Sequence, residues 1–132
     1  GDTHWAVVAS HDLSGVEAGL LHDAYMGYPG EWLPRSRGAD DHMVAAAWES
    51  LLSRGLADED GDHRRVNAEG LLLREAIEHR TDELCARSWQ PLGEPRTEEL
   101  CDLVEPVGDR LLALIDATAG PNWMPAARER RR

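Results

Sequence analysis

The chain contains neither lysine nor phenylalanine, and it has only two cysteines. Cys85 and Cys101 are too few and too far apart for a structural zinc site. Without a secretion signal, we expect them to be reduced thiols that pack as small hydrophobic side chains. No apolar run is long enough to span a membrane, and no signal peptide is apparent. These absences predict a cytoplasmic protein without membrane contact.

The length of 132 residues and the hydrophobic fraction of 42% are sufficient for a packed core. We expect one domain over residues 1–120 and a flexible basic tail over residues 121–132. Because the chain begins at Gly1 and not at Met, one alternative stays open: this domain is the C-terminal half of a longer protein.

The charge of the chain is strongly negative and unevenly distributed. The net charge is −11, although four of the 14 arginines lie among the last five residues. Residues 1–127 hold 24 acidic and 10 basic side chains. Such a domain repels the phosphates of DNA unless its arginines gather on one face.

A helix, a hairpin and a second helix are predicted in the middle of the chain. Apolar residues recur at helical spacing after Ala39, and Gly55 is typical of a helix end. An acidic turn and a short strand over 63–66 follow, and then a long helix over 68–88. This order predicts a winged helix. The predicted inner face of the first helix is Met43, Ala46, Ala47, Leu51 and Leu52.

Three further segments complete a mostly α fold with a small β-hairpin. Residues 4–26 are predicted as a helix, with Asp12 or Ser14 as alternative caps for a later start. Residues 31–34 favour one short turn, and residues 97–118 form a last helix that contains a proline. In the helix over 68–88, we expect Arg74 and Glu78 to pair on the outer face.

DNA binding is the use that a winged helix suggests first. Its central helix would enter the major groove and its hairpin would contact phosphates. Residues 39–60, however, hold six acidic residues against a single arginine. The alternative is that the nearby arginines pair with these acids. The candidate DNA-binding residues are Arg35, Arg37, His42, Arg64 and Arg65.

Tryptophans and histidines provide candidates for two other kinds of site. Trp32, Trp48 and Trp89 would suit a cavity for a small planar aromatic or acidic ligand, and core packing is the alternative. His4 and His22 are candidate ligands of a metal or haem, although one helix cannot bring both to one ion, so another element must contribute. No catalytic motif is present, which favours a protein that is not an enzyme, and the sequence identifies no cofactor.

Three segments resemble one family: GVEAGLLHDAYMG, EWLPRSRGADDHMVAAAWESLLSRGLADEDG and VNAEGLLLREAIEHRTDELCARSW. They are similar to an actinobacterial, MarR-like winged-helix family of mostly uncharacterised, SalK-like proteins, one of which accompanies a natural-product pathway. The resemblance implies a winged helix-turn-helix with long terminal helices that form a homodimer. It also implies counterparts for His4 and His22 and a helical region before residue 1.

The chain differs from MarR proteins at the position of the recognition helix, which begins here with Asp40, Asp41 and His42. We therefore favour a regulatory, ligand-binding module linked to secondary metabolism, in which DNA binding is weak or lost. One alternative is a dimeric DNA-binding transcription regulator. A second is a metal- or haem-binding protein, or an enzyme subunit, that uses the N-terminal histidines.

Overall fold

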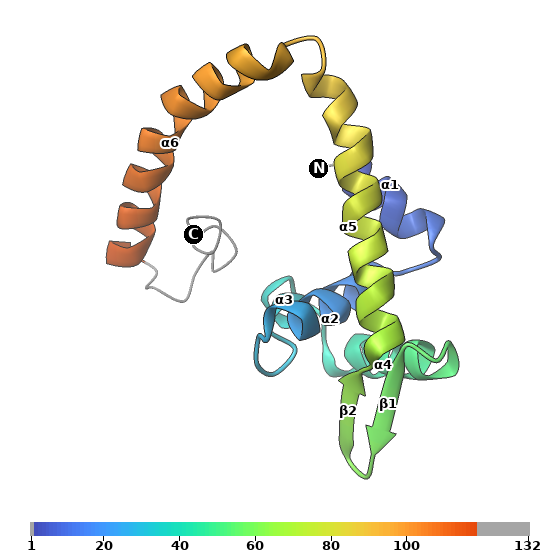
Figure 1. Cartoon of the computed structure of the whole chain (residues 1–132). Helices are drawn as coiled ribbons and strands as arrows, with labels where there is room; N and C mark the ends of the chain where they lie inside the picture. Colours follow the sequence, from blue (N-terminus) through green and yellow to red (C-terminus); the bar gives the residue numbers. More distant parts are fainter. Residues whose placement is uncertain (1, 119–132) are drawn as a thin grey trace. The chain divides into compact units, whose positions relative to one another are not determined.

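A computed structural model describes residues 2–118 (Figure 1). The predicted basic tail, residues 121–132, lies outside the described residues. The chain forms two compact units, the first over residues 1–85 and the second from residue 86 onward. The elements are α1 (Asp2–Ser10), α2 (Gly15–Met26), α3 (Trp32–Ser36), α4 (Asp41–Ser53), β1 (Ala57–Asp60), β2 (His63–Val66), α5 (Ala68–Trp89) and α6 (Gly93–Thr118). The prediction of a mostly helical fold with one small hairpin is confirmed.

The predicted helix over residues 4–26 is interrupted, and the later start is the correct one. Ser14 is the N-cap of α2, where its Oγ accepts a hydrogen bond from the backbone N–H of Glu17 at 3.2 Å. The Glu17 carboxylate accepts from the Ser14 N–H at 2.7 Å, which completes a capping box. As a result, His4 and His22 lie on different helices.

The buried face of α4 agrees with the predicted one at Ala47 and Leu51 and differs from it at Met43 and Ala46. Its buried residues are Val44, Ala47, Trp48 and Leu51, whereas Met43 is 46% exposed. Residues 43–48 are an unbroken apolar run, so several faces of this helix satisfy the helical period and only packing selects one. The predicted acidic N-terminus is present, with the Asp40 carboxylate accepting from the Met43 N–H at 2.8 Å.

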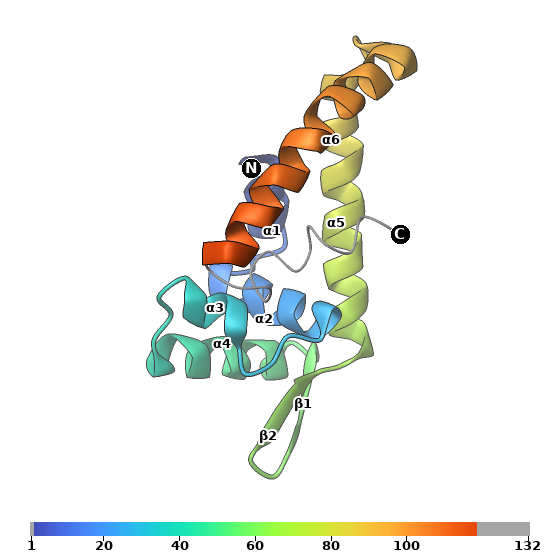
Figure 2. The same cartoon turned by 90° about the vertical axis from the view of Figure 1, so that its left-hand side faces the viewer.

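The hairpin and α5 are joined to the end of α4 by one side chain. β1 and β2 pair antiparallel, from Ala57 opposite Val66 to Asp60 opposite His63. Just after β2, Asn67 donates from Nδ2 to the carbonyl of Gly55 at 3.1 Å. Its Oδ1 accepts from the N–H of Gly70 at 3.1 Å and so caps α5. The wing and the long helix therefore leave the core at a fixed point (Figures 1 and 2).

The core of the first unit is formed by residues of α1, α2, α4, β1 and α5 and of the α1–α2 connection. Its buried hydrophobic residues are Val7, Val8, Leu13, Leu20, Leu21, Val44, Ala47, Trp48, Leu51, Ala57 and Ile77.

One prediction for α5 is wrong. Arg74 pairs with Glu78 at 3.5 Å, as expected, but the Arg74 side chain is only 14% exposed and turns inward.

Up to residue 118, the second unit comprises the last residues of α5, a short connection and α6. α6 begins at Gly93, four residues before the predicted start, and it continues through Pro106. None of its described residues is buried. Its exposed large apolar side chains are Leu103, Val104, Val107, Leu111 and Leu114.

Over residues 2–118, none of the helices combines the length and the apolar character that crossing a bilayer requires.

A substitution at Gly70 tests how closely α5 approaches the hairpin. A Cβ at this position would collide with the backbone oxygen of Leu56 and would lie 2.6 Å from Cγ1 of Val66. We expect Gly70→Ala to lower the free energy of unfolding by about 1–3 kcal/mol in urea denaturation. Gly15→Ala is the control, since its Cβ would meet only the Trp5 ring at an ordinary 3.6 Å. Equal stability of the two variants would contradict the close approach.

Candidate functional site

The elements α3, α4 and the hairpin have the arrangement of a winged helix-turn-helix (Figure 2). α3 and α4 are joined by a short turn in which Gly38 has a φ of 88°, a left-handed conformation that favours glycine. α4 occupies the recognition-helix position, and β1 and β2 form the wing. The predicted DNA-binding residues belong to these elements or to their junctions.

The outer face of α4 carries no lysine or arginine. Asp41, His42, Met43 and Glu49 are exposed there, and residues 41–53 contain no lysine or arginine. Arg54 follows the helix, but it donates to the carbonyl oxygens of His11 and Asp12 at 2.9 and 3.1 Å. This arginine holds the α1–α2 connection and is not directed to a ligand.

Arg35 is held by two carboxylates. Its guanidinium lies 3.0 Å from Glu31 and 2.6 Å from Asp41. The hydrogen bonds to Glu31 and Asp41 raise the pKa of Arg35 above its usual value. A phosphate must compete with both carboxylates for this side chain.

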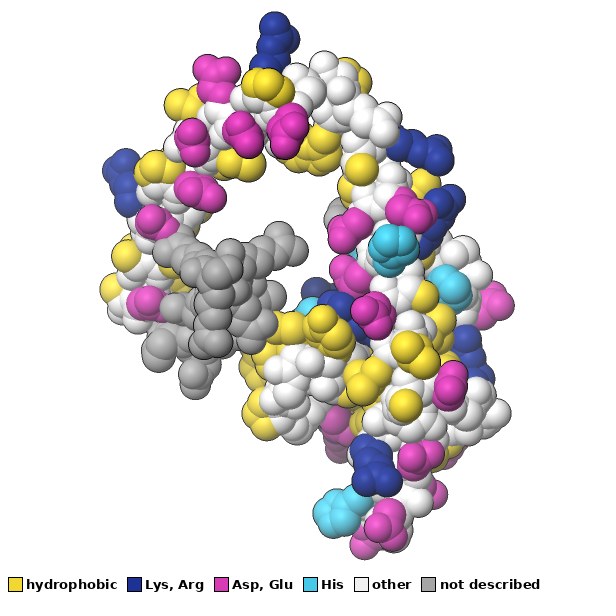
Figure 3. All heavy atoms as spheres, viewed as in Figure 1, with side chains coloured by type: hydrophobic (Ala, Val, Ile, Leu, Met, Phe, Trp, Pro, Cys, Tyr) yellow, Lys and Arg dark blue, Asp and Glu magenta, His cyan; other side chains and the backbone are white. Residues whose placement is uncertain are grey.

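The two arginines of the wing are paired in the same way. Arg64 lies 2.9 Å from Glu59, the residue opposite it in the register, and Arg65 lies 4.0 Å from Asp58. Acidic side chains gather at the hairpin (Figure 3). Three of the four predicted phosphate-binding arginines therefore have acidic partners within the domain.

Arg37 is the exception among these four arginines. The described part of the chain shows no ion pair for Arg37, whose guanidinium lies 6.0 Å from the centre of the Trp5 ring. Its charge acts on two residues of α2, since it lowers the pKa of Asp23 and that of His22.

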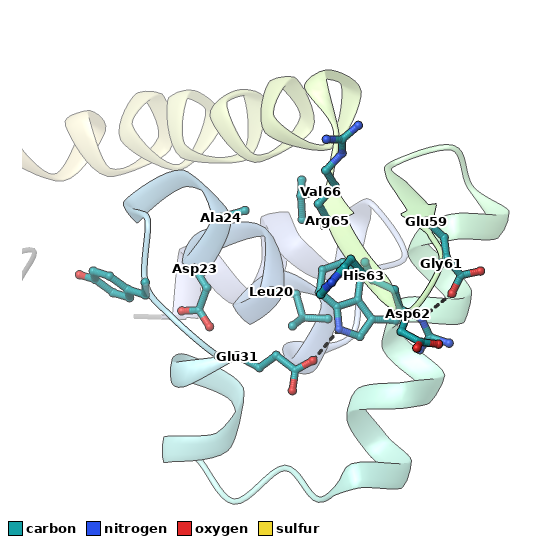
Figure 4. Close-up of a pocket in the computed structure, with 14 residues that line it drawn as sticks. Leu20, Asp23, Ala24, Glu31, Glu59, Gly61, Asp62, His63, Arg65 and Val66 are labelled. Atoms are coloured by element: carbon teal, nitrogen blue, oxygen red, sulfur yellow. Dashed lines mark hydrogen bonds and ion pairs between the residues drawn. The ribbon is translucent and has the colours of Figure 1, made fainter.

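A cavity of about 750 Å³ lies between the wing, α2 and the α2–α3 connection (Figure 4). Asp23 and Glu31 enter it from one side, and Glu59 and Asp62 enter it from the hairpin. Trp48 also lines it and donates from Nε1 to Glu31 at 2.7 Å. Arg64 and Arg65 line the same cavity, so its charge is mixed, and the small aromatic or acidic ligand stays a prediction.

The predicted tryptophan pocket is distributed over separate places. Trp48 lines the wing cavity, which neither Trp32 nor Trp89 lines. The ring of Trp32 meets that of Tyr28 edge-on, with centroids 5.5 Å apart. Trp89 is the last residue of α5 and belongs to the second unit. A common ligand for these three tryptophans stays a prediction.

The predicted metal ligands His4 and His22 do approach one another. Both line a second cavity, between α1, α2 and α5. Within residues 2–118, however, no group of three or more His, Cys, Asp or Glu side chains is placed to hold a metal ion. Arg74 also lines this cavity, although its spacing from Glu78 predicted a pair on the surface.

Two buried carboxylates of α2 have pKa values shifted in opposite directions. Burial raises the pKa of Glu17, but hydrogen bonds from Ser14 and Ser50 and the charge of Arg54 outweigh burial and lower the pKa overall. Burial raises the pKa of Asp23, and the nearby charge of Glu31 adds to this effect. Asp23 still accepts from the Leu33 N–H at 2.9 Å and so ties α2 to α3.

Comparison with known proteins agrees with this architecture. The fold defines a winged helix-turn-helix protein. A helix-turn-helix family profile matches residues 1–118, and the chain belongs to this family. Neither the curated proteins nor the solved structures provide a match. Membership of this family suggests a DNA-binding regulatory module.

The two carboxylates predict opposite pH dependences. Glu17→Gln is expected to cost about 1–2 kcal/mol at neutral pH, a cost that disappears as the pH falls from 4.5 through the lowered pKa of the folded protein. Asp23→Asn removes a carboxylate that folding makes harder to ionise. The stability of the Asp23→Asn variant relative to the wild type is therefore highest above the raised pKa of Asp23. This advantage falls as the pH drops toward 3.8.

Urea denaturation of both variants and the wild type between pH 3 and pH 7 measures these differences. If the stability of the two variants relative to the wild type changed with pH in the same way, the opposite pKa shifts of Glu17 and Asp23 would be contradicted.

Proposed function

We propose that this chain is a helix-turn-helix regulatory module that responds to a small ligand and binds duplex DNA weakly. The pairing of Arg35, Arg64 and Arg65 with carboxylates carries this proposal. Each such pair must be broken before the arginine neutralises a phosphate, and the freed carboxylate would then face the DNA backbone. The acidic side chains on the outer face of α4 also repel the phosphates of DNA.

The resemblance to SalK-like proteins is the only support for a link to secondary metabolism. A cytoplasmic location belongs to the same proposal, because regulators and their DNA share that compartment.

A second candidate function is a conventional DNA-binding transcription regulator. Family membership and the winged helix-turn-helix architecture favour it, since Arg35, Arg64 and Arg65 lie beside the recognition helix or on the wing. In that case the phosphates would replace the carboxylate partners. Arg64→Ala with Arg65→Ala should then flatten the salt dependence of DNA binding.

DNA binding separates the two candidates. We expect fluorescence anisotropy of a labelled random-sequence duplex at low salt to show a dissociation constant no tighter than about 10⁻⁴ M for the wild type. Asp41→Asn, Asp58→Asn and Glu59→Gln together release Arg65 and Arg64 and remove one of the two carboxylate partners of Arg35. The triple variant is expected to gain binding whose logarithm falls with the logarithm of salt, with a slope of up to about −3.

The control for this gain removes three exposed acids elsewhere: Glu75→Gln, Asp82→Asn and Asp102→Asn. It changes the net charge equally but leaves the arginine pairs intact. Micromolar, salt-sensitive binding by the wild type would put the conventional regulator first. Equal gains in the two triple variants would show that net charge, and not pairing, limits binding.

We further infer that the chain forms a homodimer through α6. Leu103, Val107, Leu111 and Leu114 recur at three- and four-residue steps and are 50–68% exposed, so they form one uncovered apolar stripe. A second copy of α6 is the simplest apolar partner, because antiparallel or parallel pairing covers both stripes at once. The resemblance to MarR proteins supports the same use of the terminal helix.

Sedimentation over a concentration series tests the dimer. Leu111→Asp is expected to shift the chain to the monomer, since an unpaired charge in an apolar interface is strongly unfavourable. Ala113→Asp introduces the same charge at an exposed position on the polar side of α6 and is expected to leave the dimer intact. A wild-type monomer at all concentrations would exclude this interface.

A further inference from the structure

The wing cavity has one wall from the core and another from the hairpin (Figure 4). Its volume of about 750 Å³ is within the range of small-molecule sites. Leu20, Val66 and the aromatic residues Tyr28 and Trp48 provide apolar surface. A compact organic molecule therefore finds both space and apolar contact here.

Asp23 is the buried carboxylate of this cavity. The residue is only 4% exposed, and its carboxylate lies on the same side of the cavity as that of Glu31 (Figure 4). Both of its oxygens accept from one donor, the backbone N–H of Leu33, at 2.9 and 3.2 Å. A carboxylate has about four acceptor sites, so most of the hydrogen-bonding capacity of Asp23 is unused among the described residues.

The surroundings of Asp23 disfavour its ionised form. Burial raises its pKa, and the charge of Glu31 adds to this effect. The charge of Arg37 acts in the opposite direction but does not reverse the rise. Within residues 2–118, no side chain donates a hydrogen bond to the Asp23 carboxylate. A cation placed against this carboxylate would stabilise its ionised form.

The two arginines that line the cavity have acidic partners on the hairpin itself. Arg64 lies 2.9 Å from Glu59, and Arg65 lies 4.0 Å from Asp58. The side chain of Arg65 also points away from Asp23 (Figure 4). Neither guanidinium forms an ion pair with the buried carboxylate.

Glu31 is the second carboxylate on the side of Asp23, and both of its oxygens are in use. Oε1 accepts from Nε1 of Trp48 at 2.7 Å, and Oε2 accepts from Arg35 at 3.0 Å. Asp23 and the exposed Asp62 of the hairpin turn then remain as the lining carboxylates without an ion pair in the described part of the chain. The unmatched charge of the cavity is therefore negative, although arginines line it.

The unused acceptor sites of Asp23 favour a cation that carries N–H groups. A primary ammonium has three donors, whereas a quaternary ammonium has none. A metal ion is not favoured, because the described residues contain no group of three or more His, Cys, Asp or Glu side chains placed to hold one. An acidic guest would bring a second negative charge to a carboxylate that burial already disfavours.

The geometry points to a small organic primary ammonium compound as the ligand of the wing cavity, with its ammonium at Asp23 and its apolar body against Trp48. This inference rests on the proposed function, since it identifies the ligand class to which the module responds. Residues 63–66 of the wing line the same cavity, so the ligand contacts the element that approaches DNA in a winged helix.

The probe is 2-phenylethylammonium. Its N,N,N-trimethyl derivative keeps the ring and the charge but has no N–H, and 3-phenylpropanoate has a similar shape with the opposite charge. The whole ¹³C,¹⁵N-labelled chain is titrated with each compound while the assigned tryptophan indole N–H signals are followed by NMR. We expect phenylethylammonium to shift the Trp48 signal and to leave those of Trp5 and Trp89 unchanged. The two other compounds are expected to bind at least about tenfold more weakly, because neither donates a charged hydrogen bond.

Asp23→Asn tests the buried charge at almost constant volume. The amide oxygen still accepts from Leu33, but the side chain has no charge, so phenylethylammonium should bind at least about tenfold more weakly. Asp82→Asn is the matched control, because Asp82 is exposed on α5 and does not line the cavity, and it should leave the affinity unchanged. The comparison of phenylethylammonium with its trimethyl derivative uses the wild type and does not depend on the stability of any variant.

The absence of a Trp48 shift at millimolar phenylethylammonium would overturn the inference. Equal affinity for the ammonium compound and its trimethyl derivative would also overturn it, as would tighter binding of phenylpropanoate or a shift confined to Trp5.

The titration and the DNA experiment fail independently. Weak duplex binding together with no phenylethylammonium binding would remove this ligand site and leave the rest of the regulatory proposal in place. Strong duplex binding by the wild type together with a saturable Trp48 shift would leave the ligand site and replace the proposal of weak DNA binding.

Discussion

The close approach of backbone at Gly70 is the constraint on which the first unit depends. The Leu56 carbonyl, the Val66 side chain and the start of α5 meet at a point that leaves no space for a Cβ. Asn67 closes the same junction by bonding both the end of α4 and the first turn of α5. Because the wing and α5 leave this junction together, its geometry determines where the hairpin lies relative to the recognition helix.

The acidic residues of this domain act locally, because they form ion pairs with its arginines. Arg35 is held between Glu31 and Asp41, and Glu31 also accepts the indole N–H of Trp48. Glu31 has a φ of 60°, an uncommon conformation for a residue with a side chain, and these two interactions hold it in place. The arginine that precedes the recognition helix is thus part of the packing of that helix. A helix-turn-helix can thus retain its architecture while its basic residues form ion pairs within the domain.

The interruption between α1 and α2 has a functional consequence. An unbroken helix would have kept His4 and His22 far apart on one line. The Ser14 capping box starts a new helix, so the two histidines approach the same cavity from different elements. Arg74 turns toward them from α5, and its hydrogen bond fixes the proton position on His22. This local break therefore brings both histidines to one cavity.

The sequence by itself determined the class of fold and the main boundaries, because these depend on local signals. Gly55, the acidic turn and the apolar periods were sufficient to place α4, the hairpin and α5. Only tertiary structure selected the buried face of α4, because an apolar run such as residues 43–48 satisfies several helical faces. Likewise, the spacing of Arg74 and Glu78 predicted their pairing, but their inward orientation depends on α1 and α2, which are distant in sequence. The cavity between α1, α2 and α5 could not be predicted for the same physical reason: its walls come from separate helices, and only their packing brings them together.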